Sequence, residues 1–394
     1  MKEDFIDNGL TNPLKNKKIL VIQKMGSIGG AEKNLEKIID SFSEKYHVSF
    51  LILSPCIGPF FARLSPKNVS FVRSNLPDWR KGKNFISRYF YILRHFFLLR
   101  EKTFDLIYVN DFFYAPYGLS LSRLKKVPCI VHVQSDIEEK RVSQYKLDKV
   151  DGVIVTTFST FERVNKFFSR STGKKLFLVQ CGSDVRDNNH LSIENKKGNF
   201  IFGIVANVLP HKGIKFFLSL IKSIKDIDLK DWEIHWVGGD PQSIVNDLRK
   251  EVFSLNLQSK VFFDGFINNM DDFYESIDCL IHPAQYEPFG IAMIEAMSHG
   301  IPVISTKTSG GIEILGDVDD GRWLVDLDDF AGMLTRMSVL MKDQAVYKKV
   351  SLLVFDKFMK NYTIEISMKK MENIFIEALE NRKIGLQVNH VENG

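Results

Sequence analysis

The feature that most constrains the fold is a repeated alternation of short apolar runs with longer amphipathic segments. The apolar runs have the length and composition of buried strands. They form one series at residues 18–22, 48–53, 69–72, 105–109, 127–133, 153–156 and 176–179, and a second at 200–205, 233–237, 260–263, 278–282, 302–304 and 323–325. Strands that alternate with helices are typical of parallel sheets covered by helices on both faces. We therefore predict an α/β protein with two Rossmann-like, doubly wound domains facing across a cleft.

A polar stretch separates the two series. Residues from Asp184 to Asn199 are rich in Asp, Asn, Lys and Glu and interrupt the strand pattern, as a linker does. The length of 394 residues favours two or three domains over one. We expect an N-terminal domain over 1–190 and a C-terminal domain over 191–360, followed within 361–394 by a helix that packs back toward the N-terminal domain and a tail.

Charge and cysteine content exclude several classes of protein. The chain has 53 basic and 48 acidic residues, a net charge of +5, which does not favour nucleic-acid binding. The four cysteines form no Cys-x-x-Cys pair and no Cys/His group with zinc spacing, so we expect a reducing compartment. The polar N-terminus does not resemble a signal peptide, and no apolar run is long enough to span a bilayer. We expect a cytoplasmic protein, with peripheral attachment to the inner face of the cell membrane as an open alternative.

The most informative motif is a pair of carboxylates, Glu287 and Glu295, with seven residues between them. Pro288 and Gly290 are typical of a helix start, so Glu287 should lie in a loop and Glu295 inside the helix that follows. The first turn of a helix offers free N–H groups to anions and polar oxygens. Open α/β sheets bind ligands at the carboxyl ends of their strands, and the run at 278–282 ends just before this loop. A capped surface helix with ordinary glutamates is the alternative for such a pair taken alone.

Glycine turns follow several of the predicted strands. The first, Met25 to Glu32, contains Gly29, Gly30, Ala31 and Glu32 but lacks both the dinucleotide and the triphosphate fingerprints. The segment from Ala206 to Gly213 places Lys212 at a helix start, where an ammonium group favours a diphosphate. Gly238-Gly239 would let a base or ribose approach, and Gly310-Gly311 could hold a phosphate. Each is equally explained as a tight turn, with one exception. Lys212 and Glu287 both follow strands of the second series, and this shared position favours a functional role for the lysine.

Two further features concern the first series. His132 ends an apolar run and would face the cleft, where it could stabilise developing charge, although a lone His at such a place is more often structural. The segment 85–102 is amphipathic, with Arg88, His95 and Lys102 on one face and Phe and Leu residues opposite. Together with the basic residues after Arg80, residues 80–102 could contact an anionic membrane. The alternative is a core helix with a solvated basic face.

Taken together, these motifs resemble the retaining glycosyltransferases of the GT-B fold, in glycosyltransferase family 4, the group 1 transferases. The resemblance extends from about Ile19 to Val325 and rests on the Glu287–Glu295 pattern, on Gly29 to Glu32, on His132 and on Lys212-Gly213. It implies that Glu295 binds the ribose and that Glu287 contacts the donor sugar beside the N–H groups of Phe289, Gly290 and Ile291. It implies also that Lys212 neutralises the diphosphate, that His132 lies near the donor sugar and that residues 29–32 form the acceptor-side loop.

The implied reaction moves a hexose-type sugar from a nucleotide-diphosphate sugar to a glycan or lipid-linked saccharide, without a cofactor or metal and with the anomeric configuration kept. Surface polysaccharide synthesis in bacteria is the expected setting. One position departs from the family pattern: Asn207 stands where an Arg is usual, so diphosphate binding would depend more on Lys212. This leaves two alternatives open, a catalytically silent partner subunit of the same fold and a sugar-nucleotide epimerase.

Overall fold

The computed structural model describes residues 12–24, 29–55, 58–64, 68–76, 85–168, 175–185, 198–225 and 231–391. The chain divides into two compact units, one formed by Met1–Val179 with Met368–Gly394 and the other by Gln180–Ser367. The boundaries therefore fall at 179/180 and 367/368, where the sequence led us to expect 190/191 and 360/361. Most of the expected linker, residues 186–197, lies outside the described residues.

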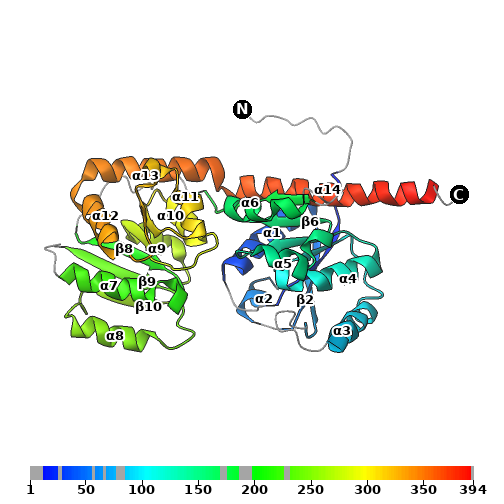
Figure 1. Cartoon of the computed structure of the whole chain (residues 1–394), viewed down its shortest axis with the longest axis horizontal. Helices are drawn as coiled ribbons and strands as arrows, with labels where there is room; N and C mark the ends of the chain where they lie inside the picture. Colours follow the sequence, from blue (N-terminus) through cyan, green and yellow to red (C-terminus); the bar gives the residue numbers. More distant parts are fainter. Residues whose placement is uncertain are drawn as a thin grey trace. The chain divides into compact units, whose positions relative to one another are not determined.

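The first unit is built on a seven-stranded sheet of order β3-β2-β1-β4-β5-β6-β7, and every pairing is parallel. Its central strands β4, β5 and β6 are buried along their whole length because helices cover both faces of such a sheet (Figure 1). The elements are β1 (Lys18–Ile22), α1 (Gly30–Tyr46), β2 (Ser49–Ser54), α2 (Pro59–Leu64), β3 (Val69–Arg73), α3 (Phe85–Leu98), β4 (Leu106–Val109), α4 (Ala115–Lys125), β5 (Cys129–Val133), α5 (Glu139–Gln144), β6 (Gly152–Val155), α6 (Phe158–Phe168) and β7 (Lys175–Leu178).

The second unit contains a six-stranded sheet of order β10-β9-β8-β11-β12-β13, again parallel at every pairing. Its elements are β8 (Phe200–Val205), the 3-10 turn η4 (Pro210–Lys212), α7 (Ile214–Lys225), β9 (Trp232–Val237), α8 (Val245–Ser254), β10 (Val261–Gly265), α9 (Met270–Ser276), β11 (Cys279–His282), α10 (Ile291–Ser298), β12 (Val303–Thr306), α11 (Ser309–Leu315), β13 (Leu324–Val325), α12 (Phe330–Lys342) and α13 (Gln344–Asn361). The two predicted Rossmann-like α/β domains are confirmed.

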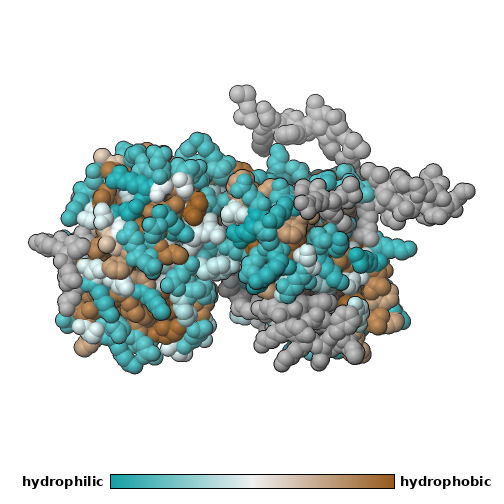
Figure 2. Space-filling model, viewed as in Figure 1, coloured by the Kyte–Doolittle hydropathy of each residue, from teal (hydrophilic) through white to brown (hydrophobic). Residues whose placement is uncertain are grey.

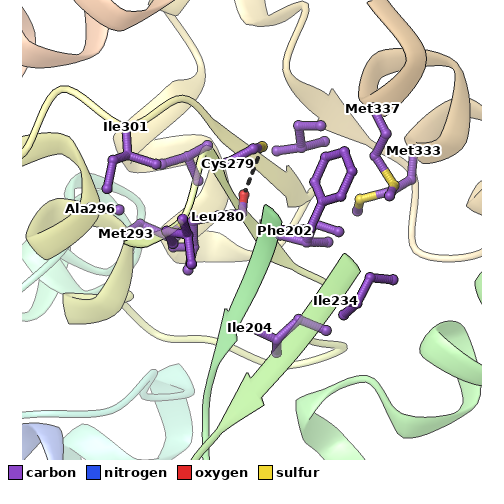
Figure 3. Packing of buried hydrophobic residues seen from close by; sticks show 14 of the residues in the cluster. Phe202, Ile204, Ile234, Cys279, Leu280, Met293, Ala296, Ile301, Met333 and Met337 are labelled. Atoms are coloured by element: carbon purple, nitrogen blue, oxygen red, sulfur yellow. Dashed lines mark hydrogen bonds between the residues drawn. The ribbon is translucent and has the colours of Figure 1, made fainter. Parts of the chain in front are cut away.

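The core of the second unit forms where helices press on the sheet. Met333 and Met337 of α12 lie next to Phe202 of β8, and Met293 of α10 lies beside Leu280 of β11 (Figure 3). All five side chains are buried. This packing fixes the carboxyl ends of β8 and β11, which carry the loops discussed below.

The last helix, α14 (Ile364–Val391), begins in one unit and continues in the other. At its start, Ser183 and Thr363 form a parallel bridge within the second unit. Farther along, the ring of Phe375 packs edge-on against Phe42 of α1 and lies 5.7 Å from the ring of Tyr108. Helix α14 is thus part of the core of the first unit, although its sequence is far from the rest of that unit. Among the described residues, no helix is long and apolar enough to cross a membrane.

Candidate active site

The Glu287 loop connects β11 to α10 at the carboxyl edge of the second sheet. Gly290 caps the helix with φ of 104°, a left-handed conformation that favours glycine, and α10 begins at Ile291. The buried ring of Phe289 anchors the loop against Tyr362. The predicted helix start is therefore present, with Glu287 in the loop and Glu295 in the second turn.

Glu287 is the centre of a charged triad. Its Oε2 atom accepts hydrogen bonds from Lys212 Nζ at 2.7 Å and pairs with His282 Nε2 at 3.1 Å. Burial alone would raise the pKa of Glu287, but the hydrogen bonds and positive charges of His282 and Lys212 outweigh it and lower this pKa to about 2. The carboxylate is therefore ionised at neutral pH, and it can only accept hydrogen bonds.

The Lys212 loop is held against the Glu287 loop by backbone contacts. Gln285 N–H donates to His211 O at 2.9 Å. Gly213 has φ of 94°, and a Cβ atom there would lie 2.1 Å from Pro283 O, so only glycine allows this approach. The lysine and the glutamate are thus positioned by one joint structure rather than by two independent loops.

Glu295 has a separate support. Tyr274 of α9 donates its hydroxyl proton to Glu295 Oε2 at 2.9 Å. Burial raises the pKa of the Tyr274 hydroxyl, and the Glu295 charge raises it further, so the phenol stays a donor. The carboxylate of Glu295 is half-buried and fixed in orientation.

The turn at Gly310 and Gly311 has a structural role in this unit. Gly310 N–H donates to Glu287 O at 2.9 Å, and Gly311 N–H donates to Thr308 Oγ1 at 3.1 Å. A Cβ atom on Gly310 would lie 1.9 Å from Phe289 O. The Gly310 N–H therefore holds the Glu287 loop and the Gly311 N–H is taken up by the cap of α11, which argues against the phosphate role considered for this turn.

Gly238 and Asn207 hold two loops of the same edge together. Gly238 has φ of 150°, and a Cβ atom there would lie 2.0 Å from Ala206 O. Asn207 is exposed, and its Oδ1 atom accepts a hydrogen bond from Gly239 N–H at 3.0 Å. The side-chain oxygen of Asn207, the position that differs from the family pattern, thus stabilises the turn that follows β9.

In the first unit, His132 is buried inside the sheet. Its Nδ1 atom pairs with the Tyr108 hydroxyl at 2.6 Å, and burial lowers its pKa to about 3, so the ring is neutral. Gln134 follows on the same face at the carboxyl end of β5 and is half-buried. Gln134 Nε2 donates to Asn110 Oδ1 at 3.0 Å. The polar side chain that is partly exposed at the carboxyl end of β5 is therefore Gln134, directly after the strand, rather than His132.

The loop expected on the acceptor side leads into helix α1. Residues 25–28 lie outside the described residues, while Gly29 caps the helix and Gly30 and Ala31 form its first turn. Glu32 is buried and accepts a hydrogen bond from Gln23 Nε2 at 2.8 Å, and burial raises its pKa. Asn110 Nδ2 donates to Gln23 Oε1 at 2.9 Å and links this loop to β4.

Sequence reasoning missed several of these residues. Tyr274 gives no signal, because a tyrosine in a short helix is usually core. Gln23, Asn110 and Gln134 each come directly after a strand of the first sheet, and this shared position is a signal that could have found them. In the part of the chain that is described, no group of three or more His, Cys, Asp or Glu residues could hold a metal ion.

Comparison with known proteins identifies a family domain that lies mostly in the second unit. Residues 185–351 match the family model described as Glycosyl transferases group 1. The Escherichia coli UDP-Gal:alpha-D-GlcNAc-diphosphoundecaprenol alpha-1,3-galactosyltransferase is 22% identical over 84% of this chain and 86% of its own length. The capsular polysaccharide biosynthesis glycosyltransferase CapM of Staphylococcus aureus is 23% identical over 48% of this chain and 50% of its own.

Solved structures show the same architecture over nearly the whole chain. The structure of Anabaena HepE in complex with UDP and glucose has a TM-score of 0.74 at 18% identity and covers 91% of this chain and 99% of its own. A glycosyltransferase from Rickettsia africae has a TM-score of 0.76 at 15% identity, with coverage of 93% and 99%. The fold is thus GT-B, and residues 185–351 form a glycosyl transferases group 1 domain in a chain whose enzyme class is glycosyltransferase.

Proposed function

We propose that this GT-B glycosyltransferase with a group 1 domain is a retaining, metal-independent enzyme of glycosyltransferase family 4. It moves a hexose-type sugar from a nucleotide-diphosphate sugar to a saccharide acceptor in bacterial surface polysaccharide synthesis. The observation that carries the proposal is the triad of Lys212, Glu287 and His282 beside the helix that holds Glu295. Relatives named for lipopolysaccharide core and capsule synthesis support the biological setting.

Lys212 and Glu295 bind the two ends of the nucleotide diphosphate in this proposal. Lys212 Nζ already neutralises one carboxylate, and a diphosphate would take over part of that charge. Glu295 accepts hydrogen bonds from the ribose hydroxyls, in the orientation that Tyr274 fixes. The N–H groups of Phe289, Gly290 and Ile291 supply further donors at the start of α10.

Glu287 acts by position rather than by proton transfer. With a pKa of about 2 it is a weak base at neutral pH and carries no proton to donate. It therefore accepts hydrogen bonds from the hydroxyls of the donor sugar. The bond from the anomeric carbon to the leaving phosphate oxygen breaks as the acceptor oxygen attacks on the same face. The acceptor proton then passes to that phosphate oxygen, and the protein contributes orientation and electrostatics.

Gln134 and the Gly29–Glu32 loop supply the polar groups of the first unit. Gln134 can donate or accept a hydrogen bond, whereas the neutral His132 ring is enclosed by the sheet. We assign Gln134 the sugar-facing role expected for His132, and His132 a supporting role through Tyr108. The acceptor is a glycan or a lipid-linked saccharide, and the second class agrees with the diphosphoundecaprenol in the name of the Escherichia coli relative.

The deciding experiment combines a donor panel with a matched pair of lysine variants. We expect one nucleoside diphosphate to raise the melting temperature of the protein, and Lys212→Ala to remove most of that increase. Lys215→Ala changes the same charge three residues along, at an exposed position, and should keep it. NMR of the product with a suitable acceptor should show the donor's anomeric configuration retained.

Four outcomes would contradict the proposal. An inverted product would refute the retaining mechanism, and loss of transfer after exhaustive metal chelation would refute metal independence. A protein that gives no melting shift, no transfer and no donor hydrolysis would be the silent partner subunit. Conversion of the donor sugar without an acceptor would identify the epimerase.

A further inference from the structure

The buried and exposed faces of helix α3 are the reverse of those that the sequence suggests. Its inward side is formed by Ile92, His95 and, just beyond the helix, Leu99, all of which are buried. His95 packs edge-on against the ring of Tyr117 of α4, and burial lowers its pKa to about 4, so it is neutral at physiological pH. The expected solvated basic face, with His95 at its centre, is therefore wrong. Lys102 lies beyond the helix end, and the side chain of Arg88 lies outside the described residues.

The outward side of α3 is apolar instead. Phe90 and Phe97 are 63% and 61% exposed, and Leu93 and Tyr89 are 53% and 51% exposed. Leu98 at the end of α3 and Leu124 of α4 extend this surface. We call these six side chains the α3 patch. Figure 2 shows a hydrophobic area in the region that α3 occupies in Figure 1. Six large apolar side chains on two neighbouring helices far exceed the scattered exposure of an ordinary surface.

Cations surround the α3 patch almost without acids. Arg94 projects from the same side of the helix as Phe90 and Phe97, because residues three and four apart share a helix face. Residues 89–102 and 115–126 also carry Arg100, Lys102, Arg123, Lys125 and Lys126, and their only acid is Glu101, which pairs with Arg100. Lys125 Nζ donates to Leu99 O and Arg100 O and ties α4 to the end of α3.

We propose that the α3 patch is a docking surface for an anionic lipid bilayer. An amphipathic helix with aromatic and leucine side chains lies in the headgroup region, and flanking Arg and Lys side chains are attracted to acidic lipids. A second copy of the chain fits poorly, because a two-fold contact through this patch would bring six cations toward six cations. The inference goes beyond the proposed transfer reaction, since it requires neither a donor nor an acceptor.

The test is sedimentation of the full chain with lipid vesicles at low salt. We expect binding to phosphatidylglycerol-containing vesicles, weaker binding to pure phosphatidylcholine vesicles, and a decline as salt rises. Phe90→Ser/Phe97→Ser should reduce the partition coefficient at least about tenfold. Phe253→Ser/Phe266→Ser removes two apolar side chains of the second unit, 67% and 65% exposed, and should bind like wild type.

The charge requirement is tested in the same way. Arg94→Glu/Arg123→Glu should abolish the preference for anionic vesicles, whereas Lys348→Glu, at an exposed position of α13, should keep it. Equal thermal melting of all variants shows that folding is intact. The inference is overturned if wild type does not bind, if patch and control variants bind alike, or if the patch variants instead dissociate a dimer. Nucleotide-induced melting shifts, measured without vesicles, report on the proposed reaction separately.

Discussion

At the residue scale, the site depends on how partners change the chemistry of single side chains. Glu287 shares one oxygen between Lys212 and His282, and these two partners determine that it is ionised in a buried place. His132 has a phenol as its partner and remains neutral. The same residue types have different partners elsewhere, as Glu233 has in Asn199 and His235, so the residue type alone could not assign the roles.

The first prediction concerns acid stability. A carboxyl whose folded pKa lies below its unfolded value contributes stability above the unfolded value, and this is lost as pH falls through the folded one. For Glu287 the window runs from about 4.5 down to about 2, and the contribution is on the order of 3 kcal/mol. We expect Glu287→Gln to flatten the fall of unfolding free energy across this window, as measured by denaturant titration at several pH values. Glu251→Gln, an exposed control on α8, should leave the slope unchanged.

The second prediction separates Gln134 from His132. Gln134→Ala should lower kcat at least about tenfold with little change in melting temperature, because its amide lies at the sheet edge. His132→Ala should instead destabilise the first unit by about 2–4 kcal/mol, because it leaves a cavity and an unpaired Tyr108 hydroxyl. Steady-state kinetics and thermal unfolding check both variants. Equal kinetic losses without destabilisation would return the catalytic role to His132.

At the element scale, the loops that follow the strands position the side chains of the site, and glycine turns hold these loops in place. The turn at Gly310 braces the Glu287 loop, and the turn at Gly213 braces the Lys212 loop. Both depend on a backbone approach that a Cβ atom would prevent. The glycines of these turns were visible in the sequence, but their partners were not, because the contacts join residues about twenty or more positions apart.

The third prediction tests the start of α10. Gly290→Ala must adopt φ of 104°, and its Cβ atom would meet the end of the Met293 side chain. We expect a loss of about 1–3 kcal/mol in unfolding free energy and weaker nucleotide binding, measured by denaturation and calorimetry. Gly198→Ala has a similar φ of 128° with nothing within 4 Å, so it isolates the conformational cost. If both variants bind nucleotide equally well, the Gly290 cap has no role in the donor site.

At the scale of the whole molecule, α14 makes the two units depend on one chain segment. Its first residues pair with Ser183 in the second unit, and Phe375 completes the core of the first. Each unit nevertheless has its own sheet and its own buried cluster. The units should therefore unfold as separable cooperative blocks.

The fourth prediction follows from this division. Phe375→Ala should destabilise the first unit by about 3–5 kcal/mol, because the ring is fully buried between Phe42 and Tyr108. A nucleoside diphosphate should raise the melting transition of the second unit and leave the other transition in place. Calorimetry with and without nucleotide distinguishes the two. A single transition that shifts as a whole in both experiments would refute separable units.

The sequence by itself determined the alternating architecture, the helix start at Pro288 and Gly290, and the carboxylate pair, since these depend on local periodicity and turn chemistry. The tertiary structure alone decided which groups meet. The pairing of Lys212 with Glu287, the support of Glu295 by Tyr274 and the outward rotation of Phe90 and Phe97 all arise from packing between distant segments. Amphipathic spacing defines two faces of a helix, but only its neighbours determine which face is buried, and at α3 they enclosed the histidine and left the phenylalanines exposed.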